Sequence, residues 1–395
     1  MNLIFFDDNG VERLLPLTFY RPTAALRTGI LTNAERWERI LQVDGSYHTR
    51  PYLSKAFPLT VTEDNLLLNG RLLPDEELVE AVRNLQKGEY LVCEEVIVAA
   101  RLGAGSLNSW DMLQPPEGSR KKTCAAVKMI RYGWDLFALC DEFIRYDFEL
   151  ITQGRESAPL SNTNTVIGDG PVFLEEGAVA ECAVFNTNGG PVYLGAHSEV
   201  MEGAVVRGPF ALGEHSVLKM MAKIYGATSI GPHCKVGGEV SNSVFLGYAN
   251  KAHDGFLGQA VISHWCNLGA DTNNSNLKNT YGKVRMWSYP EQQFISTELQ
   301  FCGLLMGDHS KCGINTMFNT GTVVGVNCNI FGAGYQKNRI PSFSKGSGAK
   351  MSGYSLEKNK EVAAIVYQRR GLPFDEVERE IMASVYQLCS ANKHY

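Results

Sequence analysis

The sequence lacks the features that mark membrane proteins and nucleic-acid-binding proteins. No run of about 18 apolar residues occurs in the 395-residue chain, which excludes a candidate membrane-spanning helix. It has no block of lysine and arginine, and its formal net charge is −5, so nothing indicates a nucleic-acid partner. None of the ten cysteines is spaced as C-x-x-C, and the first residues, MNLIFFDDNG, lack the basic leader of a signal peptide. We therefore expect a cytoplasmic protein whose length requires two or more domains.

The most regular feature is an aliphatic residue at every sixth position. The first run comprises Leu194, Val200, Val206, Leu212, Leu218, Ile224, Ile230 and Val236, and the period returns at Met306, Cys312, Phe318, Val324 and Ile330. Mostly small residues recur four positions after each aliphatic residue, as at Ser198, Ala204 and Ser216. A six-residue aliphatic period is typical of the hexapeptide β-helix, in which stacked coils bury these residues in continuous columns.

The rest of the chain divides around this repeat. Residues 1–155 alternate strand and helix signals without the period, which predicts an α/β domain. Residues 156–340 are predicted to form the β-helix, and residues 341–395 a helical tail that packs back on it and covers one end. Within these parts we expect strands at 3–6, 66–68 and 90–92, and helices at 33–41, 74–85, 134–143, 357–368 and 374–388.

Two segments interrupt the period and are predicted to be loops. They are Phe185–Pro191, rich in glycine and asparagine, and the polar segment Asp271–Phe301. Between them, the same spacing extends the buried column through Val240, Leu246 and Ala252. Loops that interrupt a rigid solenoid are natural places for a binding site.

Histidines divide into two groups when they are set against the repeat. His197, His215, His233 and His309 share one repeat position, and the first three are 18 residues apart, so three units per coil would stack them as a ladder. The ladder either faces solvent at the coil corners or holds a metal ion, although imidazoles on one face make a poor tetrahedral cage. His253 directly follows the extrapolated column residue 252. It is the candidate general base, with a purely structural role as the alternative.

The segment around His253 resembles one half of a known bifunctional family. Lys251-Ala-His253, Phe256-Leu-Gly258 and Cys266-Asn267-Leu-Gly-Ala270 are similar to motifs of N-acetylglucosamine-1-phosphate uridylyltransferase / glucosamine-1-phosphate acetyltransferase. The resemblance implies a left-handed β-helix, a homotrimer, acetyl-CoA as co-substrate, and His253 as the base that deprotonates the sugar amine. It also implies sugar-phosphate contacts, which fall on Lys223, Asn267, Asn276 and Lys283. The chain departs from the family at Ser241-Asn242, in place of a lysine, and at Phe256, in place of a tyrosine.

The N-terminal part is similar to a shorter, divergent branch of this family, described as sugar nucleotidyltransferases. The likeness rests on the segments Leu15–Thr32 and Leu68–Pro74. Nucleotidyl transfer needs a glycine-rich turn for the triphosphate and carboxylates for Mg²⁺. The first strand here ends in Asp-Asp-Asn-Gly without a second glycine, and Arg71 replaces the metal carboxylate of the family. These replacements leave open whether the domain is active.

Five residues of this domain are candidates for the nucleotide site. Asp7 and Asp8 are candidate Mg²⁺ ligands because they follow the first strand directly. Arg21, Arg27 and Lys55 are candidate phosphate contacts, and Arg21 and Arg27 could equally be ordinary surface charges.

Three functions remain open from the sequence. The first is acyl transfer from acetyl-CoA to an amino-sugar 1-phosphate in the β-helix, with possible nucleotidyl transfer to a sugar 1-phosphate in the N-terminal domain. The second is a non-catalytic trimer that binds a sugar nucleotide or serves as a scaffold. The third is a metal-dependent β-helix enzyme that uses the histidine ladder.

Overall fold

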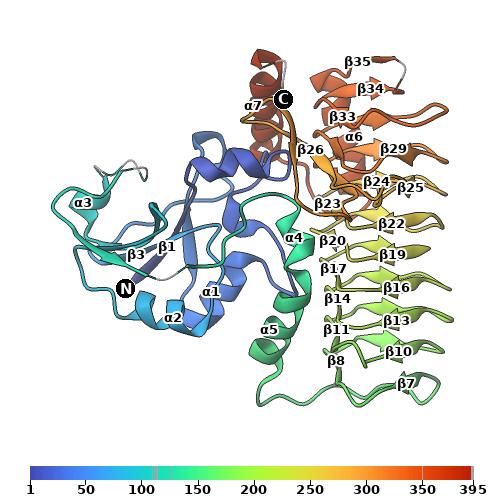
Figure 1. Ribbon diagram of the computed structural model, residues 1–395, viewed down its shortest axis with the longest axis horizontal. Helices are drawn as coiled ribbons and strands as arrows, with labels where there is room; N and C mark the ends of the chain where they lie inside the picture. The colour runs from blue at the N-terminus through green and yellow to red at the C-terminus, as the bar shows by residue number, and fades with distance from the viewer. Residues whose placement is uncertain (109, 111, 113, 125, 349, 393–395) are drawn as a thin grey trace.

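The computed structural model describes residues 1–108, 110, 112, 114–124, 126–348 and 350–392. An N-terminal α/β part lies beside a long stack of short parallel strands, and two C-terminal helices follow (Figure 1). The stack is a parallel β-solenoid of the left-handed β-helix type with about ten turns, so the predicted fold class is confirmed. Within the described ranges, no helix is both long and apolar enough to cross a membrane.

A mixed six-stranded sheet forms the centre of the N-terminal part. Its strands are β1 (Asn2–Phe6), β2 (Gly45–His48), β3 (Asn65–Asn69), β4 (Glu89–Cys93), β5 (Val96–Leu102) and β6 (Arg120–Thr123). The order across the sheet is β2-β1-β3-β5-β4-β6, with β1 parallel to both neighbours and β5 antiparallel to both of its own. Every residue of β3 is buried, which agrees with its apolar sequence.

Helices of the N-terminal part begin where local sequence signals predict them. α1 (Asn33–Leu41) has a capping box, in which the Thr32 hydroxyl accepts from the Glu35 N–H and the Glu35 carboxylate accepts from the Thr32 N–H. The predicted helix at 134–143 divides at Leu139 and extends further than expected. The other helical segments are α2 (Glu76–Arg83), α3 (Ala104–Asn108), α4 (Asp135–Ala138), α5 (Cys140–Thr152) and short 3-10 helices η1 (Asn9–Leu14), η2 (Thr23–Ala25) and η3 (Pro51–Leu53).

The solenoid has three faces, each a sheet that runs along the stack. The six-stranded face contains β7 (Thr165–Ile167), β10 (Val184–Asn186), β13 (Val205–Arg207), β16 (Lys223–Tyr225), β19 (Glu239–Ser241) and β22 (Phe256–Gly258). The nine-stranded face contains β8 (Val172–Leu174), β11 (Val192–Leu194), β14 (Phe210–Leu212), β17 (Thr228–Ile230), β20 (Val244–Phe245), β23 (Val261–Ile262), β28 (Leu304–Met306), β31 (Thr322–Val324) and β33 (Arg339–Ile340). The ten-stranded face contains β9 (Val179–Ala180), β12 (Glu199–Val200), β15 (Val217–Leu218), β18 (Lys235–Val236), β21 (Asn250–Lys251), β24 (Asn267–Leu268), β29 (Lys311–Cys312), β32 (Asn329–Ile330), β34 (Ser344–Gly346) and β35 (Met351–Gly353).

The column predicted from the six-residue period fills the solenoid. Every aliphatic or substituting residue of both runs is at most 4% exposed, and all of them belong to one apolar cluster inside the coils. The small residues Ser198, Ala204 and Ser216 are equally buried. Each coil therefore buries its apolar residues against the coils above and below, as the repeat pattern requires.

The extrapolated column is correct at Val240, which is buried and pairs with Ile224, but it is wrong at Leu246 and Ala252. Val236 pairs with Lys251 in the ten-stranded face, so the inward residue of that coil is Lys251 and not Ala252. In the nine-stranded face the inward residue is Phe245, whereas Leu246 packs outward against the N-terminal part. This coil places equivalent residues 15 positions apart, whereas the preceding coil places them 18 apart. The turns of this coil contain fewer residues, so the six-residue spacing no longer identifies its inward positions.

The first predicted interruption, Phe185–Pro191, is only partly a loop. Phe185 lies in β10, is fully buried and pairs with Val206 of the next coil. The turn itself is confined to residues 188–190.

The second predicted interruption, Asp271–Phe301, holds a folded insertion. β25 (Asn273–Asn274) still pairs in parallel with β30 (Met317–Phe318), and the antiparallel hairpin of β26 (Arg285–Ser288) and β27 (Gln293–Ser296) follows. Tyr289 of this insertion contacts Phe19, with ring centroids 6.1 Å apart. The insertion therefore packs against the N-terminal part.

The C-terminal tail consists of α6 (Leu356–Gln368) and α7 (Glu376–Ala391), close to the predicted ranges. Tyr367 of α6 stacks on Trp265 at a corner of the solenoid, with ring centroids 4.1 Å apart. The expectation that the tail packs back on the solenoid is confirmed.

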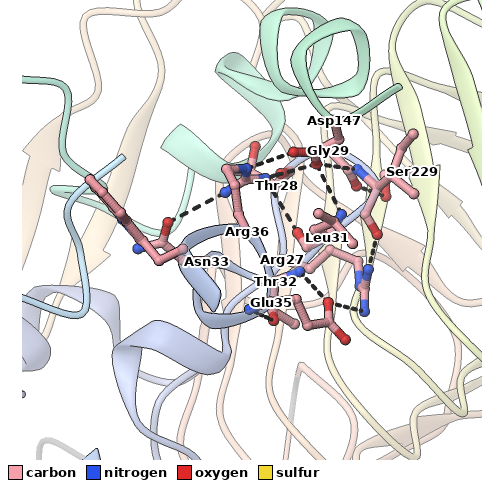
Figure 2. Close-up of polar contacts among 12 residues, drawn as sticks. Arg27, Thr28, Gly29, Leu31, Thr32, Asn33, Glu35, Arg36, Asp147 and Ser229 are labelled. Atoms are coloured by element: carbon pink, nitrogen blue, oxygen red, sulfur yellow. Dashed lines mark hydrogen bonds and ion pairs between the residues drawn. The ribbon is translucent and has the colours of Figure 1, made fainter. Parts of the chain in front are cut away.

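A fully buried ion pair inside the N-terminal part lies beside the contact of this part with the nine-stranded face (Figure 2). The Arg36 Nε of α1 lies 2.6 Å from Asp147 Oδ1 of α5. Asp147 also accepts from the backbone N–H groups of Ile30 and Leu31. Beside this pair, the hydroxyl of Ser229 in β17 donates to the Gly29 carbonyl at 2.5 Å. The segment 28–36 thus joins α1, α5 and the solenoid.

Candidate functional site

His253 lies at an exposed corner of the solenoid, between β21 and β22. Because Lys251 is the inward residue, His253 occupies an ordinary corner position, two residues after the column. The same position in other coils holds Met220 and Ile314, which are 62% and 71% exposed. No hydrogen bond to the His253 imidazole occurs within the described ranges. The prediction that His253 directly follows a column residue is therefore wrong, although His253 still lies outside the histidine ladder and its side chain is exposed.

Lys251 holds the His253 corner from inside the solenoid. It is only 1% exposed, and its Nζ donates to the carbonyls of Gly237 at 2.9 Å and His253 at 2.8 Å. Burial lowers the pKa of Lys251 to about 8, whereas the charges of Asp254 and Asp271 act in the opposite direction. Lys251 belongs to the motif around His253, but no role was predicted for it from the sequence. The feature that could have drawn attention to it is a charged residue at an inward position of the coil, which is normally apolar.

The four predicted substrate contacts lie on different sides of the solenoid. Lys223 is exposed on β16 of the six-stranded face, and Asn267 lies on β24 of the ten-stranded face, where it accepts from the Asn250 amide at 2.8 Å. Asn276 donates to the Gln259 side chain at 2.5 Å. Lys283 forms an exposed ion pair with Glu298 in the insertion.

The four residues and His253 do not contact one another through polar groups. No hydrogen bond or ion pair among the described residues joins any two of the five side chains. Their roles stay predictions, and a shared site would need groups from more than one face of the solenoid.

The carboxylates after β1 are held by donors of the chain itself. Asp7 accepts from the N–H and hydroxyl of Thr23 and from the Thr49 hydroxyl. Asp8 accepts from Arg71 Nε at 2.8 Å and forms a second contact with the same guanidinium, and it also accepts from the Asn69 amide. Burial by itself raises the pKa of Asp8, but Arg71 outweighs it and holds that pKa below its ordinary value.

This donor set does not fit Mg²⁺. A magnesium ion needs free carboxylate oxygens, and here the Arg71 guanidinium occupies both oxygens of Asp8. No group of three or more metal-ligating side chains occurs in the part of the chain that the structure describes.

The three predicted phosphate contacts are also engaged. Arg21 is buried, pairs with Asp308 and donates to the Ser263 hydroxyl at 2.9 Å. Arg27 is buried, contacts the Ile30 carbonyl, and lies 3.5 Å from Glu35. Exposed Lys55 pairs with Glu380 of α7 at 2.5 Å. The alternative that Arg21 and Arg27 are surface charges is therefore wrong, and their nucleotide-binding role stays a prediction.

The histidine ladder exists and is a stack of parallel rings. Ring centroids of His197 and His215 are 5.1 Å apart, and those of His215 and His233 are 5.0 Å apart, with interplanar angles of 18° and 14°. Tyr248 and Trp265 continue the same stack. The rings present their faces to one another, an arrangement that supports stacking and not a shared metal ligand sphere.

His309 differs from the expectation of a solvent-facing ladder because it is 5% exposed. It lines a 410 Å³ cavity, together with Arg21, His264, Asp308 and Glu378, between the N-terminal part, the solenoid and α7. Burial lowers the pKa of both His264 and His309, and the nearby Arg21 charge acts in the same direction. This cluster could not be predicted from the sequence because its members come from four distant segments.

Residues 3–156 match the model of a family described as sugar nucleotidyl transferase. The match spans less than half of the chain and coincides with the N-terminal α/β part. It supports a transferase of sugar-related chemistry, without a specific substrate. No curated protein matches the chain.

Two solved structures are similar to the chain at low identity. The polySia-specific acetyltransferase NeuO is 13% identical, with a TM-score of 0.31, and the match covers 52% of this chain and 98% of NeuO. The UDP-N-acetylglucosamine acyltransferase of Arabidopsis is 16% identical, with a TM-score of 0.20, and the match covers 52% of this chain and 77% of that protein. These likenesses are too distant to assign a function.

Proposed function

We propose that the solenoid transfers an acyl group from acetyl-CoA to an amino-sugar 1-phosphate, with His253 as general base. The observation that carries the proposal is the His253 corner. Its imidazole is exposed, while Lys251 ties the backbone carbonyl of the same residue to the neighbouring coil. A base with a fixed backbone and a free ring can meet a substrate without a preceding rearrangement.

The proposed step is a direct transfer between bound substrates. The sugar amine nitrogen forms a bond to the acyl carbon, the carbon–sulfur bond of the thioester breaks, and CoA leaves as the thiol. The neutral imidazole of His253 takes the proton that the amine loses and passes it to the departing sulfur. A lysine such as Lys223 would balance the charge of the sugar phosphate.

A second copy of the chain would complete this site. Lys223 lies on the six-stranded face and Asn267 on the ten-stranded face, on either side of the His253 corner. Exposed apolar side chains follow the same corner and face, namely Val205, Met220, Met221, Tyr225 and Ile314. We therefore propose a homotrimer in which neighbouring solenoids meet here, and light scattering after size exclusion measures it. A monomeric mass in solution would contradict this assembly.

The decisive test is release of free CoA thiol from acetyl-CoA in the presence of glucosamine 1-phosphate. His253→Ala should lower the rate by about 10²- to 10⁴-fold, the usual contribution of a general base. His215→Ala is the matched control, because it removes an exposed histidine of the same solenoid outside the proposed site. Equal rates in the wild type and His253→Ala would sink the proposal.

A second function is favoured by one observation in the N-terminal part. The Arg71 guanidinium contacts both oxygens of the Asp8 carboxylate. Nucleotidyl transfer needs such a carboxylate to bind a metal ion. We propose that this domain binds a sugar nucleotide without turning it over. The test pairs a binding titration of UDP-sugars with an assay of pyrophosphate release from UTP and a sugar 1-phosphate. Magnesium-dependent pyrophosphate release at enzymatic rates would overturn this reading.

A further inference from the structure

A cavity of 340 Å³ lies between the ten-stranded face and the end of α6. Its volume is within the range of small-molecule sites in proteins. Residues from four coils and from the C-terminal tail surround it, namely Lys235, Tyr248, Asn250, Trp265, Cys266, Asn267, Lys311, Val366, Arg369 and Arg370.

This cavity, here called the basic cavity, has only positively charged side chains among its charged lining residues. Lys235 and Lys311 approach from the solenoid, and Arg369 and Arg370 approach from the tail. Among the described residues that line it, none is aspartate or glutamate, and no ion pair joins any of these four cations to a carboxylate. The basic cavity therefore concentrates positive charge that the chain does not balance locally.

The neighbouring 410 Å³ cavity contains a buried cation that is paired within the chain. There Arg21 is paired with Asp308 and hydrogen-bonded to Ser263. Lys311, by contrast, is half-buried, and its Nζ donates to the His309 carbonyl at 2.9 Å. Burial lowers the pKa of Lys311 to about 8.

The end of α6 explains only part of this arrangement. Arg369 is the C-cap residue of α6, and cations are favoured near the carbonyl end of a helix. That effect does not apply to Lys235 and Lys311, which stand on short strands of the solenoid. Two separate pairs of cations converge on one cavity, beside the amides of Asn250 and Asn267. The carbonyl end of α6 does not explain this convergence.

We propose that the basic cavity binds the polyphosphate group of a nucleotide-type ligand. Two or more phosphates would neutralise the four cations, and the two asparagine amides would donate to remaining phosphate or ribose oxygens. The faces of Tyr248 and Trp265 are already used in the ring stack, so these rings form an apolar wall and do not sandwich a base. Recognition therefore rests on phosphate, and bound ligand would fasten α6 to the solenoid.

The test is isothermal titration calorimetry on the full chain with four probes: inorganic pyrophosphate, ADP, UDP and CoA. At least one probe should bind, and Lys311→Gln and Arg370→Gln should each weaken that binding by about tenfold or more. Lys121→Gln on β6 removes a lysine from an exposed strand of the N-terminal sheet and should leave binding within about twofold. Added salt should weaken binding, because the attraction is between charges.

The probes also separate the possible sources of the phosphates. Equal binding of pyrophosphate and nucleotides supports a site that reads phosphate alone, and tighter binding of CoA or of one nucleotide supports that molecule as the natural ligand. If Lys311→Gln unfolds, Arg370→Gln gives the same test from the tail. The proposal is overturned if none of the probes binds at about 1 mM, or if both variants bind like the wild type. Neither result depends on acyl transfer at His253.

Discussion

Along the solenoid, each coil buries apolar residues against the coils above and below, whereas the N-terminal part combines its apolar core with buried charge pairs between distant residues. The first region follows a six-residue period over most of its length. The second contains the buried pair of Arg36 with Asp147 and is joined to the solenoid by the pair of Arg21 with Asp308. The difference shows that a column of apolar residues can be predicted from the local sequence pattern, whereas long-range ion pairs cannot.

The comparison also distinguishes the two candidate sites. In the N-terminal part, the carboxylates and cations that could serve a nucleotide are already paired within the chain, as Asp8 is with Arg71. On the solenoid, His253 and the cations of the basic cavity are not. We infer that the Asp8–Arg71 pair of the first region serves structure, and that the charges of the basic cavity are available for ligands.

The largest effect is expected from breaking the buried pair of the N-terminal part. Asp147→Ala leaves Arg36 as an uncompensated buried charge and should lower the free energy of unfolding by about 3–5 kcal/mol. Urea denaturation measures the change. Asp141→Ala on the same helix is the control, because its pair with Arg145 is exposed and should contribute about 0.5 kcal/mol or less. Equal losses in the two variants would remove the basis of the comparison.

The matching change in the solenoid is Leu218→Ala. Leu218 is a fully buried column residue, and its truncation should cost about 2–5 kcal/mol through lost burial and a cavity. Val217→Ala, one position earlier on the outer side of the same strand, should cost far less. Hydrogen exchange should show the loss concentrated in the neighbouring coils, since each coil contacts only its neighbours. A loss spread evenly over the whole chain would argue against this view of the solenoid.

A smaller and pH-dependent effect is expected at Asp8. Arg71→Met removes its charged partner and should cost about 1.5–3 kcal/mol at pH 7. The folded-state pKa of Asp8 lies below the ordinary value of 3.8, so the pair stabilises the fold above that value and loses its effect as pH falls through the folded-state pKa. The stability gap between wild type and variant should therefore narrow below about pH 4. A gap that is constant from pH 7 to pH 3 would contradict the assignment.

The smallest effect is expected in the histidine ladder. His215 has a positive φ of 54°, and asparagine tolerates this conformation better than most residues. His215→Asn should therefore lose only the ring stacking, at about 0.5–1 kcal/mol. Thermal unfolding measures it against Glu214→Gln, the exposed neighbour. A loss above about 3 kcal/mol would show that the ladder carries much more of the stability than its exposure suggests.

The sequence predicted the column because one residue type returns at a fixed spacing, and it failed where a coil is shorter. Phe245 and Leu246 are both apolar, so the pattern could not show which of them points inward. Lys251 made the failure worse, because a lysine is rarely buried and the alternative, Ala252, looked suitable. His253 was a candidate both from its place in the repeat and from family resemblance, whereas the role of its supporting lysine is seen only in the structure.

The basic cavity could not be predicted from spacing. Lys235 and Lys311 are far apart in sequence because the coils of β21 and β24 and the insertion lie between them. Arg369 and Arg370 reach the cavity only because α6 folds back. No local pattern records such a return of the chain. The same reason hides the cluster of Arg21, His264 and Asp308.

The N-terminal part touches the stack near both of its ends. Phe148 of α5 meets Phe173 in an early coil, and the Tyr20 hydroxyl donates to Asn327 in a late coil at 2.6 Å. Duplication or deletion of one coil between these anchors would displace one of them by the rise of a coil, roughly 4.8 Å. Unlike a free solenoid, this one cannot gain or lose repeats by recombination without losing its docked domain, so its length should be inherited as a fixed dimension.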